Sequence, residues 1–422
     1  MSNFYLLIYI LLWVVTILRQ QKKERREDVV FYINVLYLSL GVISFILFND
    51  KSVYGIDFKE LSLFPFVYLF FTLQICLKPL RTYCNSRYNS ISKVNENIIR
   101  YIAIFFIGTS LVQLPSNIIN LQEGVMKIVF DMTAGLDAYN DAALSSDTVE
   151  DGTITNIFYI FSAAFSEIGI FILFYYLTKR ETGIIIKTAL VVSVVGVIID
   201  PISKGNRTVP MLVLLALFFA YMLFKPYMRE ATNRIVKRIG IVLMIILMIP
   251  LVSITISRFA ESNSGALGSV EKYLGQSTLI FNNYAFDSGG IRYGDRTFPL
   301  FKRMIGFDNV PSNYSQRRTK YSNMKIDDSH FISFVGDFVL DYGPIMAFFI
   351  LLFFAFVFDN IIKCRSDCIP IYNLLAVYFL LNIVVQGSLY LFSYADVGGN
   401  LKIITYTITY IVLKQYGQKI RS

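Results

Sequence analysis

Long apolar runs separated by short polar segments recur along the whole chain. The runs are about 17–22 residues long, which is the length that a helix needs to cross a hydrocarbon core about 30 Å thick. A soluble protein cannot bury so many uninterrupted apolar helices, so the pattern predicts an all-α, polytopic membrane protein built as a helical bundle. We expect about eleven membrane-spanning helices, at residues 3–18, 29–48, 61–77, 101–121, 154–178, 184–200, 208–224, 239–257, 343–362, 369–387 and 398–413.

The alternating segments between these helices differ in positive charge. One set holds 23 of the 39 Lys and Arg residues, and the positive-inside rule assigns that set to the cytoplasm. Of the remaining 16, ten lie in one long segment, residues 258–330, and long segments follow the rule only weakly. Residues 1–18 have no basic leader and no small-residue cleavage site, so we expect a retained helix there. The N-terminus is then outside and the C-terminus is cytoplasmic.

Three parts are expected from this arrangement. Residues 1–257 form the first eight helices, residues 258–342 form a large outer loop, and residues 343–422 form the last three helices. The first part also contains a shorter outer loop at residues 122–153. Only these two outer loops are long enough to hold a site of their own.

The outer loop at 122–153 is acidic, with Asp and Glu residues scattered along it and a single lysine, Lys127. Its apolar stretch VMKIVF, residues 125–130, predicts a short helix that lies on the membrane surface. Calcium and magnesium sites need carboxylates that converge on one point, whereas these acids are spread out. We therefore expect a solvated flap here and no metal site.

Cysteine usage and net charge exclude other classes of protein. All four Cys residues fall at or near the cytoplasmic face, where thiols stay reduced. Cys364 and Cys368 are separated by three residues and have no partner His or Cys nearby, unlike the four ligands of a zinc site. No metal and no cofactor is expected. The net charge of +9 follows from topology and from the anionic lipid headgroups at the inner face, so it does not indicate nucleic acid binding.

The large outer loop is basic and contains several tyrosines and glycines, as in the sequence DSGGIRYGDRTF at 287–298. A loop of this length in a compact protein tends to be functional or disordered, and its aromatic and apolar residues argue against disorder. Aromatic faces suit sugar rings, while guanidinium forks suit phosphates. The candidate sugar-binding residues are Tyr293, Tyr314 and Tyr321, together with Asp337 beside the following helix.

A second group of candidates lies at the outer ends of central helices. The turn KGNRT, residues 204–208, joins two apolar helices, and Arg207 stands where the second helix begins. Because the first N–H groups of a helix have no intrahelical partner, this helix end and a guanidinium together form an anion site. Arg258 follows the next outward-running helix, so the two arginines could grip one pyrophosphate from two sides. The alternative is that each reaches lipid headgroups or pairs with an acid such as Asp200.

The stretch from 327 to 354 carries the remaining candidates. It contains His330, the only histidine, and histidine is the side chain best suited to accept a proton near neutral pH. A single histidine is more often a bystander than a catalytic residue. Asp337 and Asp341 are four residues apart and share a helix face, and they either contribute to a site or pair with the arginines of the loop. Pro344 suits the first turn of the helix that follows.

These features together resemble one known family. A Phe- and Tyr-rich polytopic chain carries a G-N-R-T turn between two central helices, at 205–208, and an arginine at the next outer helix end. One large outer loop follows, and then a His and the sequence D-Y-G-P-I at 341–345. The combination is similar to that of the Wzy-type O-antigen and capsule repeat-unit polymerases of bacteria, and more distantly to the O-antigen ligases. The resemblance covers most of the chain as architecture, although its sequence motifs are short.

The resemblance implies a GT-C-like, metal-independent glycosyltransferase. Its substrates would be undecaprenyl-pyrophosphate-linked oligosaccharides at the outer face of the bacterial inner membrane, and a chain-length regulator protein would be a further partner. A single displacement would invert the anomeric centre of the transferred sugar. The residues implied to bind the lipid pyrophosphate are Arg207, which is also counted as catalytic, Arg258, Arg292, Arg296 and Lys204.

Two further residues receive roles from the same resemblance. His330 stands where the ligases have a histidine that activates the acceptor hydroxyl, so it becomes the candidate general base. Asp341 matches the acid of the family's D-x-G motif and is counted with the catalytic residues. Polymerases do not uniformly keep such a histidine, so a loop carboxylate is the alternative base.

Two other functions stay open at this point. An O-antigen ligase would share nearly every feature above. A flippase or transporter of lipid-linked oligosaccharides would be a non-enzyme, and such proteins are expected to carry charged residues within their helices and a two-fold internal repeat. The main charged residues within the predicted spans are Glu167 and Lys187, and no clear repeat is visible. The pattern therefore favours the polymerase.

Overall fold

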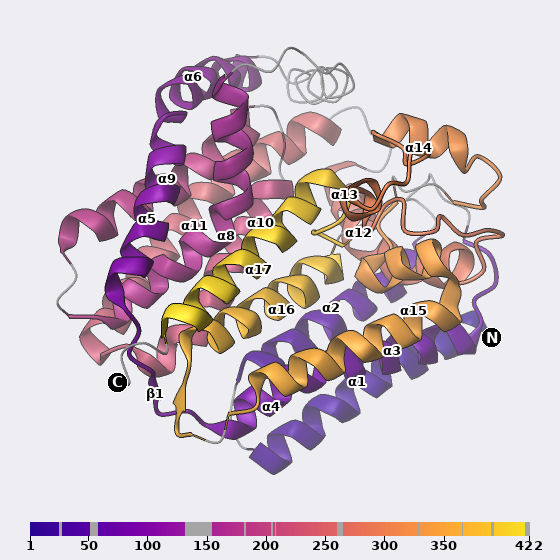
Figure 1. Ribbon diagram of the computed structural model, residues 1–422. Coiled ribbons are helices and arrows are strands. Elements are labelled where there is room, and N and C mark those ends of the chain that lie inside the picture. The colour runs from indigo at the N-terminus through magenta and orange to yellow at the C-terminus, as the bar shows by residue number, and fades with distance from the viewer. Residues whose placement is uncertain are drawn as a thin grey trace. The chain divides into compact units, whose positions relative to one another are not determined.

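The computed structural model is mostly helical (Figure 1). It describes residues 1–24, 28–50, 58–130, 154–180, 183–203, 206, 208–259, 265–326, 330–364, 366–389 and 392–417. The described chain divides into two compact units, each built from segments that are far apart in the sequence. The first unit comprises Met1–Tyr88, Asn263–Asp367 and Phe379–Ile403, and the second comprises Asn89–Ser262, Cys368–Tyr378 and Ile404–Ser422.

The first unit contains the N-terminal helices and most of the segment predicted as the large outer loop. Two further helices, α16 (Ile371–Leu389) and α17 (Asp396–Gly417), contribute residues to both units. The elements of the first unit are α1 (Ser2–Glu24), α2 (Val29–Asn49), α3 (Leu63–Cys76), α4 (Lys78–Ser86), α12 (Gly265–Ile280), the π-helical turn η2 (Phe281–Ala285), α13 (Pro299–Met304), α14 (Tyr314–Lys320) and α15 (Ser333–Ile362).

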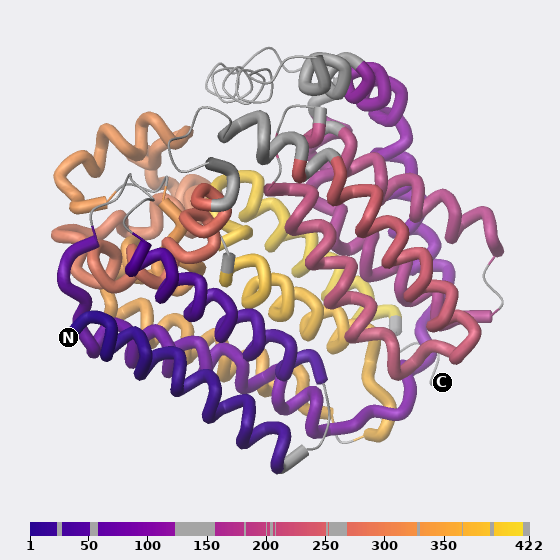
Figure 2. Tube along the Cα trace, turned by 180° about the vertical axis from the view of Figure 1, so that it is seen from behind, coloured from indigo at the N-terminus to yellow at the C-terminus, as the bar shows by residue number. Residues whose placement is uncertain are grey.

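In the first unit, α1 lies beside α2 and α3 (Figures 1 and 2), and aromatic side chains and close backbone contacts hold these helices together. Trp13 of α1 is fully buried. Its ring stacks on that of Tyr37 with 5.0 Å between the ring centroids, and it meets the Phe70 ring edge-on with 4.9 Å between the centroids. Helix α12 packs along α2, where the Ser44 hydroxyl donates to the Gly275 carbonyl at 2.7 Å. The part of the chain predicted as a large loop therefore begins with a helix that belongs to the bundle.

The second unit is a bundle of apolar helices with a small two-stranded parallel sheet, in which Ser90 pairs with Cys368. Helices α5 and α8 approach closely at Gly169, where an added Cβ would lie 2.2 Å from the Phe106 ring. Its elements are β1 (Ser90–Ile91), α5 (Glu96–Leu111), α6 (Leu114–Phe130), α8 (Ile154–Thr178), α9 (Ile184–Ser203), α10 (Thr208–Phe224), the 3-10 turn η1 (Lys225–Tyr227), α11 (Glu230–Phe259) and β2 (Cys368–Ile369).

Two contacts inside the second unit show polar side chains with uncharged partners. Glu167 of α8 is buried, and the Tyr406 hydroxyl of α17 lies 3.0 Å from its Oε2 atom. The Thr405 hydroxyl of α17 donates to the carbonyl of Ala164, which lies one turn before Glu167 on α8, at 3.1 Å. The predicted intramembrane acid therefore faces a neighbouring helix.

The lengths and composition of the helices show that the chain is a polytopic all-α membrane protein. Within the described residues, seven helices are long and apolar enough to cross a bilayer. An eighth span results if α5 and the first part of α6, which are bent by 41°, count as one. The seven are Ser2–Lys22, Val29–Asn49, Leu63–Ser86, Ile157–Thr178, Thr208–Tyr227, Ser333–Ile362 and Ile371–Ser388.

The predicted helix at 101–121 is wrong as a single straight element. Helix α5 ends at Leu111 and α6 begins at Leu114, immediately before Pro115. Proline has no N–H to continue a helix and is well tolerated in a first turn, which explains why a new helix starts there. Helix α6 then runs to Phe130, so residues 125–130 are its last part and not a separate helix.

Helix α15 also departs from the prediction, because helical structure begins ten residues before the expected start at 343. The helix is broken at Gly343, whose φ of 74° is open to glycine but strained for other residues. Pro344 follows, as predicted, at the start of a helical segment, and its carbonyl accepts a hydrogen bond of 2.6 Å from the Tyr68 hydroxyl. We call residues 333–342 the outer segment of α15.

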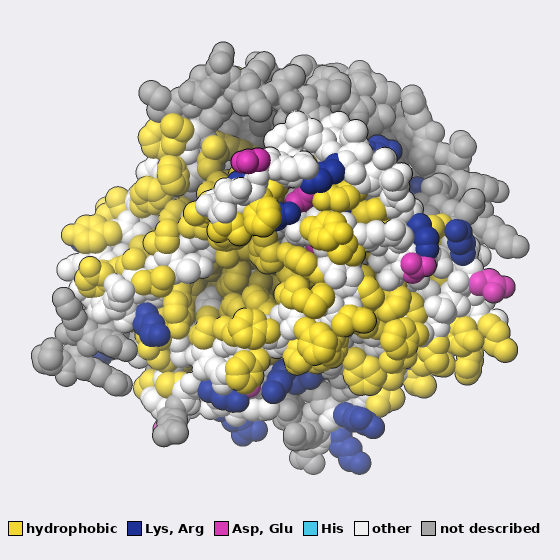
Figure 3. All heavy atoms as spheres, turned by 45° about the vertical axis from the view of Figure 1, so that its right-hand side comes forward, with side chains coloured by type: hydrophobic (Ala, Val, Ile, Leu, Met, Phe, Trp, Pro, Cys, Tyr) yellow, Lys and Arg dark blue, Asp and Glu magenta, His cyan; other side chains and the backbone are white. Residues whose placement is uncertain are grey.

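Beyond the break, α15 exposes a row of large apolar side chains. Ile345, Phe349 and Phe353 are each more than half exposed, and their spacing of four places them on one helix face. Figure 3 shows one face of the molecule on which apolar side chains cover the middle, while many Lys and Arg side chains gather along its lower edge. Such a band suits contact with the hydrocarbon of a bilayer.

Candidate functional site

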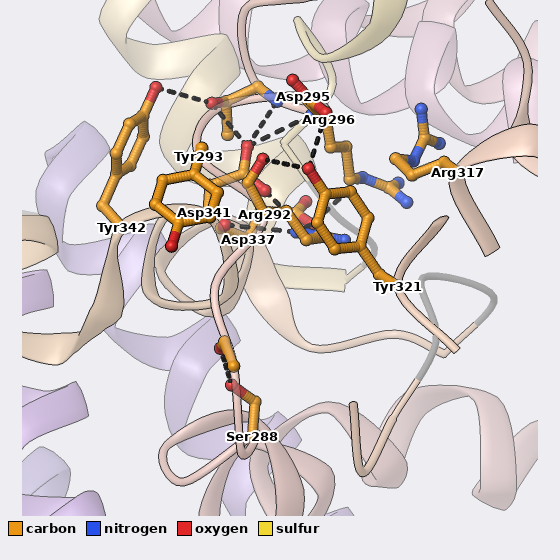
Figure 4. Close-up of polar contacts among 12 residues, drawn as sticks. Ser288, Arg292, Tyr293, Asp295, Arg296, Arg317, Tyr321, Asp337, Asp341 and Tyr342 are labelled. Atoms are coloured by element: carbon orange, nitrogen blue, oxygen red, sulfur yellow. Dashed lines mark hydrogen bonds and ion pairs between the residues drawn. The ribbon is translucent and has the colours of Figure 1, made fainter. Parts of the chain in front are cut away.

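Two arginines of the outer loop and two aspartates of α15 form a buried group of charges in the first unit, which we call the ion-pair cluster (Figure 4). Asp337 and Asp341 lie one turn apart on the outer segment of α15, so both face the loop. Arg292 and Arg296 reach them from the sequence IRYGDRTF. All four side chains are between 0% and 7% exposed.

Asp341 is the most fully bonded member of the cluster. Its Oδ1 atom accepts from Arg292 Nε at 2.7 Å. Its Oδ2 atom accepts from the backbone N–H and the hydroxyl of Thr297, each at 2.7 Å, and from the Arg296 N–H at 3.3 Å. With four donors on two oxygens, the hydrogen-bonding capacity of this carboxylate is taken up by the loop.

Asp337 joins the loop, α15 and the segment that precedes α17. Its Oδ1 atom lies 3.0 Å from Arg296 Nε and 3.4 Å from Arg292 Nη2. Its Oδ2 atom accepts from the Phe392 N–H at 2.7 Å. Of the two alternatives left by the sequence, the pairing of these acids with the loop arginines is the one found in the structure.

The ion-pair cluster is neutral, with two guanidinium groups and two carboxylates. Each charge is buried, so each depends on its partner to offset the loss of water. Removing one member of a buried pair typically costs about 3–5 kcal/mol, because the remaining charge is left uncompensated. The cluster therefore fixes the position of the loop on the outer segment of α15.

A second fixed point in the loop is Asp295, which lies between the two cluster arginines in sequence and is fully buried. Its carboxylate accepts from Lys302 Nζ, from Lys320 Nζ at 2.8 Å and from the Tyr321 hydroxyl at 2.6 Å. Burial by itself raises the pKa of Asp295, but the hydrogen bonds from these three side chains outweigh it and hold the pKa below its ordinary value. We call these four residues the Asp295 hub.

Tyr321 is held inside this hub. Its hydroxyl also lies 3.0 Å from the Arg292 carbonyl oxygen. Burial raises the pKa of the Tyr321 phenol, and its hydrogen bond to the ionised Asp295 raises it further. Tyr321 therefore stays protonated near neutral pH, and Asp295 stays ionised, so neither is suited to take a proton from a substrate.

Further contacts tie the loop to the beginning of α17. Arg317 of α14 is buried, and its Nη1 atom donates to Asp396 Oδ1 at 2.7 Å. The Asp396 N–H donates to the Arg296 carbonyl at 2.8 Å. Asn400 binds the loop from both sides, since its Nδ2 atom donates to the Thr297 carbonyl at 2.8 Å and its Oδ1 atom accepts from the backbone of residue 300 at 3.1 Å.

The tyrosines and the histidine predicted for the site have different surroundings. Tyr293 is 65% exposed, whereas Tyr314 is half-buried at the first position of α14. His330 is half-buried just before α15, and the next residue, Phe331, contacts the Tyr273 ring of α12 at 5.0 Å. The structure thus brings Tyr321 and Asp337 into the buried network and leaves Tyr293 at the surface.

The arginines predicted to clamp pyrophosphate lie largely outside the described part of the chain. Lys204 and Arg207 are not among the described residues, and Arg258 stands in the last turn of α11 without a described side chain. The neighbouring Asn206 is described, and its Oδ1 atom accepts from the N–H of Thr208 at 2.9 Å and of residue 209 at 3.4 Å. Two of the N–H groups at the start of α10 are therefore already satisfied, and an anion here would depend on Arg207.

Sequence reasoning missed the hub residues Asp295, Lys302 and Lys320, and also Arg317. A local signal for Asp295 was present, because it is an acid placed between two arginines in a glycine turn of a basic loop. The lysines and Arg317 had no such signal, since their partners are defined only by the fold. Among the described residues, no group of three or more His, Cys, Asp or Glu side chains is placed to hold a metal ion.

Comparisons of the chain with protein-family models, with curated proteins and with solved structures found no match. The resemblance to the repeat-unit polymerases therefore depends on the sequence features alone.

Proposed function

We propose that the protein is a membrane glycosyltransferase of GT-C-like architecture that polymerises lipid-linked oligosaccharide repeat units at the outer face of the bacterial inner membrane. The observation that carries the proposal is the fold of the outer loop. A segment that could have been a simple connector is fastened to α15 and α17 by the ion-pair cluster and Asn400, and it is held together internally by the Asp295 hub. A surface so firmly placed at the outer end of membrane helices suits the positioning of a substrate.

The charge of this surface supports an anionic substrate. Residues 265–326 contain nine Lys or Arg against four Asp or Glu. Buried pairing neutralises part of this charge, and others of these cations, such as Arg303, are exposed. The positive-inside rule and the anionic lipids of the inner leaflet explain positive charge on the cytoplasmic side only. A positive surplus on the outer side is explained by a substrate that carries a negatively charged pyrophosphate.

The buried pairs also divide the roles of the arginines. Arg292 and Arg296 already bind carboxylates, so we assign them to positioning the loop and not to the first contact with pyrophosphate. Arg207 and Arg258 keep the proposed role of clamping the pyrophosphate of the donor. They offset the charge that develops as the bond between the sugar and the phosphate breaks.

The proposed reaction is a single displacement. A hydroxyl of the acceptor sugar attacks the anomeric carbon of the donor, the new glycosidic bond forms, and the lipid pyrophosphate leaves with the bonding electrons. The hydroxyl proton goes to His330, because the carboxylate oxygens of Asp295 and Asp341 are already occupied by three or more donors each. The anomeric centre is inverted.

Complementation of a deletion strain tests the proposal. Loss of a polymerase leaves single repeat units on the cell surface, and the wild-type gene restores a ladder of polymer lengths on a gel. Arg207→Lys keeps the charge but loses the planar fork, so we expect at least a tenfold loss of polymer. Arg318→Lys, the same exchange at an exposed position of α14, should restore the ladder, and immunoblots of the membrane fraction check that both variants accumulate.

Other outcomes of the same experiment identify the alternatives. A deletion strain that displays no repeat units, but accumulates polymer on the lipid carrier, indicates a ligase. Accumulation of unpolymerised lipid-linked units on the cytoplasmic side indicates a flippase. A normal ladder with Arg207→Lys contradicts the clamp assignment.

A further inference from the structure

The turn at residues 292–295 has a backbone conformation that its second residue does not favour. Tyr293, with φ of 53°, and Gly294, with φ of 80°, both lie in the positive region. The Asp295 N–H donates to the Arg292 carbonyl at 3.0 Å. These are the features of a type I′ turn, in which Asn, Asp and Gly are the preferred central residues. A tyrosine at the first central position is strained, because its Cβ crowds the backbone.

The turn is anchored, so the strain is built into the folded loop. The Arg292 N–H donates to the Leu340 carbonyl in the outer segment of α15 at 2.9 Å. At Gly294, a Cβ would lie 2.5 Å from the Tyr342 hydroxyl, so only glycine fits this position. Lys302 Nζ donates to the Tyr293 carbonyl at 3.0 Å. The backbone of the turn is therefore fixed on both sides of Tyr293.

The Tyr293 side chain does not contribute to this anchoring. It is 65% exposed, and its hydroxyl makes no hydrogen bond with any residue that the structure describes. In Figure 4 its ring points away from Tyr321 and Arg317, toward the side on which Tyr342 lies. Packing therefore gives no reason for a tyrosine here, and an asparagine would suit the turn better.

We propose that Tyr293 is a carbohydrate-binding residue, whose ring stacks on a sugar of the oligosaccharide substrate. This inference rests on the proposed function and names the part of the substrate that the loop contacts. The electron-rich face of the ring attracts the polarised C–H bonds of a sugar, and the hydroxyl has hydrogen-bonding capacity available. A ring on a fixed turn loses little conformational entropy on binding, and strained residues often persist at ligand sites.

The alternative occupant of the ring face is the bilayer. Tyrosines are enriched at membrane interfaces, where they anchor a protein to the headgroup region. A tryptophan placed at position 293 separates the two alternatives. If the ring lies in the bilayer, brominated lipid quenches its emission, and if the ring binds sugar, oligosaccharide shifts its emission. The protein is suited to that test, because its one tryptophan, Trp13, is fully buried.

The first experiment separates binding from folding. Tyr293→Asn places a preferred residue in the turn, so we expect an unfolding midpoint in detergent equal to or above that of the wild type. Polymer length and yield in the complemented deletion strain should fall at least tenfold, while Tyr293→Phe keeps most activity. Tyr416→Asn, the same exchange at an exposed position near the end of α17, should leave the ladder unchanged.

The second experiment observes binding directly. Tyr293→Trp in lipid nanodiscs is titrated with oligosaccharide fragments released by mild acid from the polysaccharide of the source strain. We expect a saturable shift in emission that the wild type, with Trp13 alone, does not show. Brominated phospholipids in the nanodisc should leave the new emission largely unquenched.

Each result decides for or against the inference. Strong quenching by brominated lipid without a response to oligosaccharide assigns Tyr293 to the bilayer and overturns the proposal. A full ladder with Tyr293→Asn also overturns it, and the proposed polymerase function survives that result. If the wild-type gene does not restore a ladder, the proposed function itself fails, whereas a binding signal in the Tyr293→Trp titration would still show a sugar site.

Discussion

The outer loop and the helices of the second unit both bury polar side chains, but they satisfy them differently. In the loop, Arg292 and Arg296 meet two carboxylates, so four buried charges depend on each other. In the second unit, Glu167 accepts a hydrogen bond from the Tyr406 hydroxyl, and the nearby Thr405 hydroxyl donates to the Ala164 carbonyl. One region is held by ion pairs and the other by neutral donors.

The difference shows where the molecule requires a defined geometry. A buried ion pair is costly to break and tolerates few substitutes, so it specifies one arrangement of the loop on α15. A neutral hydrogen bond between membrane helices contributes only about 0.6 kcal/mol on average, so it can be lost with little effect. The loop is thus the region where position matters most, as expected if it binds a substrate.

The largest expected effect is that of Asp341→Ala. The change removes the acceptor of Arg292 Nε, of the Arg296 N–H and of both Thr297 donors. The two buried guanidinium groups of Arg292 and Arg296 are then left to share one carboxylate, that of Asp337, so we expect a loss of about 3–5 kcal/mol in the free energy of unfolding, together with loss of polymer. The unfolding midpoint in detergent and the cleavage rate of the loop by a protease measure it.

A matched control for this change is Asp287→Ala in the same loop. Asp287 also pairs with a lysine, Lys325, but its side chain is 82% exposed. We expect no measurable change in the unfolding midpoint. The double variant Arg292→Met/Asp341→Leu, which replaces the pair by apolar groups, should recover much of the loss. Equal midpoints for Asp341→Ala and Asp287→Ala would contradict the comparison.

A smaller effect is expected at the Asp295 hub. Asp295→Asn keeps the shape of the side chain but removes the charge that binds Lys302 and Lys320. Hydrogen bonds to charged groups contribute about 1.5–3 kcal/mol each, and less where solvent reaches the lysines, whose side chains are 19% and 30% exposed. The net loss should therefore lie below that of Asp341→Ala. Asp308→Asn, at an exposed position of the loop, is the control and should behave as the wild type.

The same carboxylate gives a pH dependence. The pKa of Asp295 is lower in the folded protein than in an unfolded chain, where it is about 3.9. Its contribution to stability is therefore complete above that value and is lost as the pH falls through the folded pKa. Unfolding midpoints should be flat from neutral pH to about 4 and fall below it, and this fall should be shallower in Asp295→Asn. A fall that begins near pH 6 contradicts the assignment.

The helices could be predicted from the sequence because their pattern is local. Helices α8 (Ile154–Thr178) and α10 (Thr208–Phe224) have the predicted bounds, since apolar runs and their polar ends are visible along the chain. The outer segment of α15 was missed. Gly343 and Pro344 are residues typical of a helix start, so the sequence pattern placed the start of the helix there and not at Ser333. The turns of the outer segment are held by Arg292 and Arg296, about 45 residues earlier in the chain.

The candidate site was predictable only in part for a related reason. The residue types of the loop indicated phosphate and sugar chemistry, and the spacing of Asp337 and Asp341 placed both on one face. Which arginine binds which acid depends on long-range contacts that no local pattern encodes. Lys302 and Lys320 show this most clearly, because both bind Asp295 from separate helices.

The smallest expected effect tests the second region. Tyr406→Phe removes the hydroxyl that lies 3.0 Å from Glu167 Oε2, without changing the shape of the ring. Because such a contact between membrane helices contributes only about 0.6 kcal/mol, the unfolding midpoint should move slightly and polymer length should not change. Tyr410→Phe, one turn further along α17, is the control.

Glu167→Gln sharpens the same test, because glutamine keeps an oxygen acceptor for Tyr406 and removes only the ionisable group. If the second unit uses this contact for packing alone, the variant should match Tyr406→Phe in both stability and polymer ladder. A variant that folds normally but abolishes the ladder would give Glu167 a role in moving protons or substrate. That result would reverse the comparison, because an acid in a neutral setting would then matter more than the ion pairs of the loop, and it would favour a transporter.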